Sequence, residues 1–326
     1  MKGRLCGSNS SPFFSKSASI LLLLTYISTV TSTDTPVIGI LAQEYTHIPS
    51  YVKAYPNYTS YIAASYVKNI EAAGARVVPI LIGQDREYYA EILTQINGVV
   101  IPGGGTGFDH PNGYADAGRQ ILHLVDKINE GGVTFPVLGV CLGFELILQV
   151  SNNDTDFRKS CKVQQVNLNL KFLPGAKRSS LFSQVPSKYI KKFYQKPLTH
   201  NNHIWCITRQ DMIKYGLTET WNILTLSKYK SWEFVSTVEH KEYPIVGIQF
   251  HPEKNAYEWT ESQHNPHSHD DIISARFFSD WFIDKARLNN NSFASRDDLY
   301  KSLIQNYPNV MSYPNKLGFE QIYLFK

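Results

Sequence analysis

The stretch that decides the fold is Pro136-Val137-Leu138-Gly139-Val140-Cys141-Leu142-Gly143-Phe144-Glu145. It begins as a short apolar run of the kind buried in a parallel sheet and continues, after one cysteine, as a helix-like run. Glycines flank the cysteine, as on a tight strand-to-helix turn where neighbouring side chains would clash. The pattern therefore predicts a strand, a sharp turn at Cys141 and a helix that begins at Leu142.

Segments on both sides repeat this alternation of strand and helix. We expect strands over residues 36–41, 76–81, 98–101, 136–140, 233–238 and 245–250, and helices over residues 58–73, 87–96, 115–128, from 142 onwards and over 271–287. The last two strands are separated by a short turn, so we expect an antiparallel hairpin there. Strands alternating with helices imply right-handed crossovers. The sequence predicts an α/β fold with a mainly parallel central sheet and helices on both faces.

The middle of the chain, residues 151–231, gives a weaker pattern. It shows apolar alternation over residues 163–170 and no helical periodicity. We interpret it as strands and loops that continue or decorate the same sheet. Since no repeat or linker interrupts the chain, residues 34–326 are expected to form one domain.

The N-terminus and the composition indicate a compartment. Of the 326 residues 43% are apolar, which suffices for a full core. The net charge of +4 comes from scattered residues, which do not form the clustered basic surface of a nucleic-acid-binding protein. Lys2, Arg4 and Lys16 precede a short apolar run over residues 20–27, with small residues after it. This pattern predicts a cleaved secretory signal over residues 1–33, with an uncleaved anchor as the alternative. No later segment is long and apolar enough to anchor the chain in a membrane.

Secretion changes how the cysteines are interpreted. Cys6 would leave with the signal, so Cys141, Cys161 and Cys206 remain and at least one thiol stays unpaired. Two interpretations of Cys161 and Cys206 stay open, a disulfide or two small buried hydrophobes. Three sequons fit a glycoprotein of the secretory pathway, whether lysosomal, vacuolar or extracellular: Asn57, Asn153 and Asn290.

Cys141 and His251 form the candidate catalytic pair. A thiol at a helix N-terminus is biased toward the nucleophilic thiolate, and the Leu142 amide points toward the same place. His251 follows the strand over residues 245–250, and the carboxyl ends of parallel strands meet at one edge of a sheet. Glu253, beyond a stiffening proline, is placed to orient the imidazole. A buried structural cysteine and a solvated surface histidine are the plain alternatives, and the two residues together favour catalysis.

Three glycines after the strand over residues 98–101 are the third feature. Gly103, Gly104 and Gly105 allow backbone amides to approach a ligand closely. With the Leu142 amide, the Gly103 and Gly104 amides are candidate donors of an oxyanion hole. A plain loop or a phosphate cradle is the alternative, but no Gly-Lys-Ser/Thr follows, which excludes a P-loop.

At these positions the chain resembles the class I glutamine amidotransferase superfamily and, within it, the γ-glutamyl hydrolases. The resemblance rests on residues 36–40, 61–68, 74–79 and 257–259, on Pro102-Gly103-Gly104-Gly105, on Cys141-Leu142-Gly143-Phe144-Glu145 and on Gln249-Phe250-His251-Pro252-Glu253-Lys254. It covers residues 36–287 and is weakest after Asn289. It implies Cys141 as nucleophile, His251 as base and then proton donor, and His203, in its His-x-Trp context, as a substrate-contacting or supporting residue.

The expected activity is hydrolysis of γ-glutamyl amide bonds, with folyl or antifolate poly-γ-glutamates as small-molecule substrates. This reaction requires no metal or organic cofactor, and the resemblance suggests a homodimer. One alternative is a glutaminase subunit that delivers ammonia to a synthetase; the signal sequence and the missing synthetase region argue against it. The other alternative is a non-catalytic binding protein. If it were right, we would expect loss of the nucleophile, the histidine or the glycine turn, but all three are present.

Overall fold

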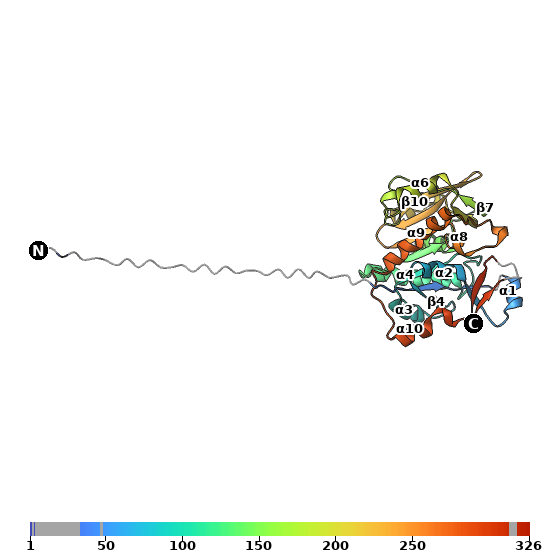
Figure 1. Ribbon diagram of the computed structural model, residues 1–326, viewed down its shortest axis with the longest axis horizontal. Coiled ribbons are helices and arrows are strands. Elements are labelled where there is room, and N and C mark those ends of the chain that lie inside the picture. Colours follow the sequence, from blue (N-terminus) through green and yellow to red (C-terminus); the bar gives the residue numbers. More distant parts are fainter. Residues whose placement is uncertain (2, 4–32, 46–47, 313–317) are drawn as a thin grey trace. The chain divides into compact units, whose positions relative to one another are not determined.

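The computed structural model describes residues 1, 3, 33–45, 48–312 and 318–326 (Figure 1). The expected signal segment, residues 1–33, lies almost entirely outside these described residues. From Thr33 onwards the described residues belong to one compact unit. Within that part of the chain, none of the helices is both long and apolar enough to pass through a membrane.

The centre of the fold is an eight-stranded sheet, in which five adjacent strands are parallel and three are antiparallel. In spatial order its strands are β4 (Arg76–Ile80), β1 (Val37–Leu41), β5 (Gly98–Ile101), β6 (Val137–Val140), β12 (Ile245–Ile248), β11 (Trp232–His240), β10 (Trp221–Tyr229) and β8 (Lys171–Phe172). The expected mainly parallel sheet is confirmed. The hairpin of β11 and β12 is antiparallel, also as expected.

Helices cover both faces of this sheet because its strands are apolar on both sides. Successive residues of β5 show the pattern: Val99 and Ile101 pack into one buried cluster and Val100 into another. The helices of the Val100 side are α2 (Ala64–Ala72), α6 (Ser187–Gln195) and α9 (His269–Ala286). Those of the opposite side are α3 (Arg86–Gln95), α4 (Tyr114–Glu130) and α5 (Leu142–Ser151).

The helix expected over residues 58–73 is wrong in its first part. A strand, β3 (Ser60–Ala63), precedes α2 and pairs with β14 (Gln321–Phe325) and β2 (Gln43–Glu44). With β13 (Asn309–Met311) these strands form a second, four-stranded sheet. The partner strand at the C-terminus is far away in the sequence, so the local apolar spacing gave no sign of it. The tail after Asn289 is thus tied to the segment that leads into α2.

The interpretation of residues 151–231 is only partly confirmed. β8 and β10 extend the central sheet, but β7 (Lys159–Leu168) and β9 (Thr199–Cys206) form a separate two-stranded sheet. Helices also occur there: α6 and α7 (Arg209–Lys214). In α6 the buried side chains Tyr189, Ile190 and Phe193 lie at helical spacing, a signal that was present in the sequence. The remaining helices are α1 (Pro49–Ala54), α8 (Lys254–Tyr257) and α10 (Arg296–Ser302).

Candidate active site

Cys141 occupies a single-residue turn between β6 and α5. Its backbone has φ 52° and ψ −104°, a left-handed conformation that costs a non-glycine residue about 1–3 kcal/mol. Its N–H donates to the carbonyl of Ile248, 2.7 Å away, which ties the turn to the neighbouring strand β12. A side chain at Gly143 would overlap the carbonyl group of Ile101, so the helix begins directly against the end of β5. The expected strand–turn–helix is confirmed.

His251 lies at the same edge of the sheet as Cys141. Strands β6 and β12 are parallel neighbours, with Val140 opposite Ile248, so both side chains follow adjacent strand ends. The Nδ1 atom of His251 lies 2.7 Å from Oε1 of Glu253, and both side chains are buried. The carboxylate thus holds one ring nitrogen, as the sequence predicted, and leaves Nε2 as the nitrogen that can accept a proton.

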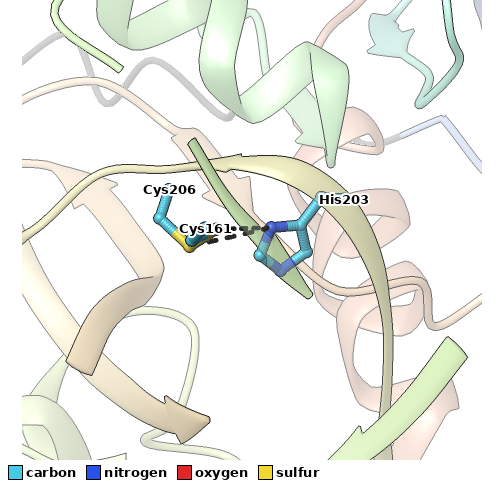
Figure 2. Close-up of side chains that lie close together, drawn as sticks. All are labelled: Cys161, His203 and Cys206. Carbon is cyan, nitrogen blue, oxygen red and sulfur yellow. Dashed lines mark hydrogen bonds between the residues drawn. A yellow bond between two sulfur atoms is a disulfide. The ribbon is translucent and has the colours of Figure 1, made fainter. Parts of the chain in front are cut away.

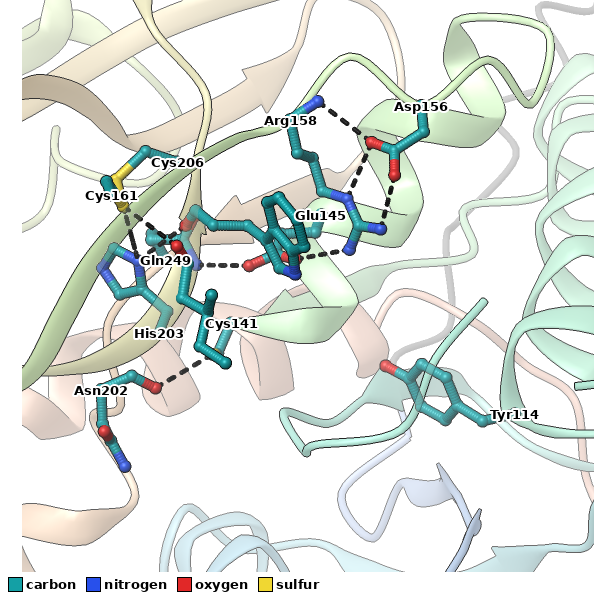
Figure 3. A network of polar contacts seen from close by, with 12 residues as sticks. Tyr114, Cys141, Glu145, Asp156, Arg158, Cys161, Asn202, His203, Cys206 and Gln249 are labelled. Carbon is teal, nitrogen blue, oxygen red and sulfur yellow. Dashed lines mark hydrogen bonds and ion pairs between the residues drawn. A yellow bond between two sulfur atoms is a disulfide. The ribbon is translucent and has the colours of Figure 1, made fainter. Parts of the chain in front are cut away.

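The two candidate catalytic side chains meet at Gly103. A Cβ atom placed on this glycine would lie 2.8 Å from Cε1 of His251 and 3.0 Å from Cβ of Cys141. The carbonyl oxygen of Asn202 lies 3.9 Å from the Cys141 sulfur (Figure 3). The pair predicted from two distant strand ends is therefore brought together in space.

The amides of the glycine loop, residues 103–105, do not all face the same way. The N–H of Gly103 donates to the hydroxyl of Tyr66, with 2.8 Å between nitrogen and oxygen, so it is engaged within the protein. The amide of Leu142, by contrast, acts on the Cys141 thiol and lowers its pKa. Gly104 lines the same cavity as Cys141 and Leu142. Of the candidate oxyanion donors, the amides of Gly104 and Leu142 fit that role better than the amide of Gly103.

Burial sets the protonation states of the pair. It raises the pKa of the Cys141 thiol well above its usual value; Glu145 adds to this, while Lys254 and the Leu142 amide act in the opposite direction. Burial also lowers the pKa of His251, against the raising effect of Glu253. The positive N-terminus of α5 favours the thiolate form of Cys141, but the cost of burying that charge is larger. The resting pair is a neutral thiol beside a neutral imidazole.

A cavity of about 250 Å³ opens at Cys141. Its walls come from the glycine loop, from the start of α5 and from β9, and its lining includes Gly104, Gly105, Thr106, Cys141, Leu142, Glu145, Asn202, His203 and Trp205. His203 is buried, and its Nδ1 lies 2.7 Å from the carbonyl oxygen of Trp205. Burial lowers the pKa of His203 to about 3, so this ring is neutral.

His203 also lies beside a disulfide between Cys161 and Cys206, whose Cα atoms are 5.8 Å apart (Figure 2). Of the two open interpretations, the pairing of these cysteines is the one observed. The Nδ1 atom of His203 lies 3.9 Å from each sulfur. Two cysteines and a histidine resemble a set of soft-metal ligands. A metal is bound by thiolates, however, and in the oxidised state these sulfurs are bonded to each other.

A charged network under the cavity was not predicted. Glu145 of α5 is buried and accepts hydrogen bonds from Arg158, at 2.8 Å, and from Gln249, at 3.1 Å (Figure 3). The Arg158 guanidinium lies 4.2 Å from the centre of the Phe108 ring and 5.4 Å from that of Trp205. This network joins α5 to the cavity wall. A glutamate one helical turn after the cysteine was its only sign in the sequence.

Known proteins match this chain along most of its length. The profile of the Peptidase C26 family matches residues 36–253. Gamma-glutamyl hydrolase B of Dictyostelium discoideum is 35% identical over 297 residues, which cover 90% of this chain and 84% of the relative. The gamma-glutamyl hydrolase of Homo sapiens is 33% identical over 291 residues, 89% of either chain. Among solved structures, a glutamine amido transferase of Methylobacillus flagellatus is 10% identical, with a TM-score of 0.41, and the match covers 80% of this chain and 98% of that one.

The family profile spans the glycine loop, Cys141, His251 and Glu253. The relatives align over nearly the whole of the unit that contains them. On this basis the chain belongs to the peptidase C26 family and is a relative of the gamma-glutamyl hydrolases.

Proposed function

We propose that the protein hydrolyses γ-glutamyl amide bonds, with Cys141 as the nucleophile and His251 as the general base and then acid. The observation that carries this proposal is the meeting of the two side chains at Gly103, beside the amides of Gly104 and Leu142. A nucleophile, a base with an orienting carboxylate and backbone donors are the parts that amide hydrolysis requires. The names of the relatives supply the bond type.

The first half of the reaction forms a thioester. As the Cys141 sulfur bonds to the γ-carbonyl carbon, its proton passes to Nε2 of His251, because the resting pair is neutral. The carbonyl oxygen becomes an oxyanion that the Gly104 and Leu142 amides stabilise. His251 then gives the proton to the leaving nitrogen as the C–N bond breaks, and a γ-glutamyl thioester remains on Cys141.

The second half returns the enzyme to its resting state. His251 takes a proton from water as the water oxygen bonds to the thioester carbon. The C–S bond breaks, the proton returns to the Cys141 sulfur, and the γ-carboxylic acid leaves. These steps use only water, the Cys141 thiol, the His251 imidazole and the backbone amides of Gly104 and Leu142.

We infer that the substrates are folyl poly-γ-glutamates. The resemblance of the motifs around Cys141 and His251 supports this substrate class, and so do the neutral His203 and the exposed Trp205 at the cavity, which offer a hydrogen-bonding group and an aromatic surface. A chain of γ-linked glutamates presents the scissile amide repeatedly. Glutamine presents the same bond with ammonia as the leaving group, so the two activities differ in what surrounds the leaving nitrogen.

The experiment is a product-resolved assay of the wild type and Cys141→Ala on pteroyl-polyglutamate, with glutamine as control substrate. We expect shortened folates and free glutamate species from the wild type and none from the variant. Release of ammonia from glutamine with no cleavage of polyglutamate would favour the glutaminase alternative. Binding of the substrate without any product would favour the non-catalytic alternative.

We also propose that the protein acts in the secretory pathway, either in a lysosome or vacuole or outside the cell. The basic and apolar N-terminus supports this, and a disulfide fits an oxidising compartment. The sequon residues Asn57, Asn153 and Asn290 are exposed, as N-glycosylation requires. Expression in eukaryotic cells should give a chain that begins near residue 34 and loses mass on enzymatic deglycosylation. Sedimentation of that material would test the expected homodimer.

A further inference from the structure

Two buried side chains from different elements hold the backbone of Gly103. The hydroxyl of Tyr66, in α2, accepts a hydrogen bond from the Gly103 N–H, with a nitrogen–oxygen distance of 2.8 Å. The side-chain amide of Gln43, in β2, donates from Nε2 to the Gly103 carbonyl, also at 2.8 Å. Tyr66 is 3% exposed and Gln43 is 1% exposed, so water does not compete for either contact. Both polar groups of this glycine are therefore fixed by side chains.

The Gln43 contact also orients the next amide. In a planar trans peptide the carbonyl of one residue and the N–H of the next point in opposite directions. With the Gly103 carbonyl held toward Gln43, the N–H of Gly104 is turned to the other side. A Cβ on Gly104 would overlap the Gln43 side chain, so the close approach requires a glycine. Gly104 is also the glycine of this peptide that lines the cavity with Cys141 and Leu142.

Tyr66 reaches the acid–base group as well. Its hydroxyl lies 3.4 Å from Nδ1 of His251, the same nitrogen that the Glu253 carboxylate contacts. Burial raises the pKa of Tyr66 well above its usual value, so the hydroxyl keeps its proton. Since the same oxygen accepts the Gly103 N–H, a single hydroxyl connects the glycine loop to the histidine–glutamate pair.

We propose that Tyr66 and Gln43 are positioning residues for the hydrolysis: Tyr66 joins the glycine loop to the His251–Glu253 pair, and Gln43 orients the Gly103–Gly104 peptide so that the Gly104 amide meets the oxyanion. This inference rests on the proposed function. A positioning role can be told apart from a purely structural one because Tyr66 and Gln43 contact different parts of the candidate active site. Gln43 contacts the glycine loop, whereas Tyr66 contacts the loop and also His251.

The variants Tyr66→Phe and Gln43→Met separate these contacts, and Tyr51→Phe is the matched control. Tyr51 is also a buried tyrosine, and its hydroxyl has no hydrogen-bond partner within the described chain. The assay follows kcat and KM on a γ-glutamyl amide across pH, with thermal melting as a check on folding. A wild type without γ-glutamyl hydrolysis would refute the proposed function itself; the inference is judged on an active wild type.

We expect Tyr66→Phe and Gln43→Met each to lower kcat by about 10- to 100-fold, with KM within about threefold, because oxyanion stabilisation acts in the transition state. In Tyr66→Phe, Nδ1 of His251 loses the neighbouring hydroxyl, so the Glu253 carboxylate acts more fully on that nitrogen. The acid limb of kcat/KM should therefore move to higher pH, while it stays in place in Gln43→Met and Tyr51→Phe. An unchanged kcat in both folded variants, or a limb that stays in place in Tyr66→Phe, would overturn the proposal. If Tyr66→Phe does not fold, an unchanged kcat in Gln43→Met overturns it alone.

Discussion

His251 and Glu253 are held together by a contact of 2.7 Å between Nδ1 and Oε1, and both side chains are shielded from water. Two opposing effects act on the imidazole. Burial lowers the pKa of His251, and the neighbouring Glu253 carboxylate raises it, by its charge and by its hydrogen bond. Burial prevails, so the imidazole stays neutral down to a lower pH than an exposed histidine would. In this neutral form it can accept a proton.

The change Glu253→Gln should move the pH profile in a defined direction. Glutamine keeps the shape but removes the charge that raises the pKa of His251, so this pKa should fall further. The acid limb of kcat/KM reports the loss of the His251 proton and should move to lower pH, while kcat falls by about 10- to 100-fold. Steady-state kinetics across the acid range measures both. A limb that stays in place or moves to higher pH would contradict this account of the pair.

Gly143→Ala should destabilise the fold rather than only slow the reaction. A methyl group there would overlap the backbone carbonyl of Ile101, and backbone atoms cannot swing aside. We expect a loss of about 1–3 kcal/mol in the free energy of unfolding, measured by urea denaturation. Gly107→Ala is the control, because a Cβ at that exposed glycine meets mainly the flexible side chain of Asp109. Equal stability of the two variants would show that overlap with the Ile101 carbonyl does not destabilise the fold.

Six strands of the central sheet, all except β8 and β10, could be predicted because each contains a short apolar run that needs no distant partner to be recognised. The strand β3 was missed because its partner β14 lies near the other end of the chain. The residues of the candidate site also divide into those that the sequence could reveal and those that it could not. Cys141 and His251 each follow a strand and carry a chemical signature, whereas Tyr66 has the spacing of a core residue in a helix. Only folding shows that its hydroxyl meets Gly103.

The disulfide between Cys161 and Cys206 should stabilise the β7–β9 sheet. It closes a loop with a sequence separation of 45 residues, and a loop of that length restricts the unfolded chain by about 4 kcal/mol in the entropic estimate. The double variant Cys161→Ala/Cys206→Ala should therefore unfold at a clearly lower urea concentration. Wild-type protein kept with a thiol reductant should approach the same midpoint. Equal midpoints for the oxidised wild type and the variant would contradict the predicted contribution.

Glu258→Gln should stabilise the protein above acid pH. Burial raises the pKa of Glu258 from 4.5 to about 7, so the unfolded chain loses this proton first as the pH rises. The wild type therefore loses stability between about pH 4.5 and pH 7, and the neutral glutamine does not. Glutamine can still accept the N–H of Glu320, which lies 2.6 Å from Oε2.

The stability difference between Glu258→Gln and wild type should grow by about 1–3 kcal/mol over that range and then level off. Urea denaturation at several pH values measures it. A difference that is the same at pH 4.5 and pH 8 would show that this carboxyl group does not titrate as its burial implies.

The most direct test of the catalytic assignment is to trap the acyl-enzyme. Protein turning over a γ-glutamyl amide is quenched in acid and digested, and the peptide that contains Cys141 is weighed by mass spectrometry. We predict a γ-glutamyl group on that peptide, and a Cys141→Ala variant that melts like the wild type but is at least about 1,000-fold less active. Turnover that survives in Cys141→Ala, or an acyl group carried by another residue, would contradict the assignment.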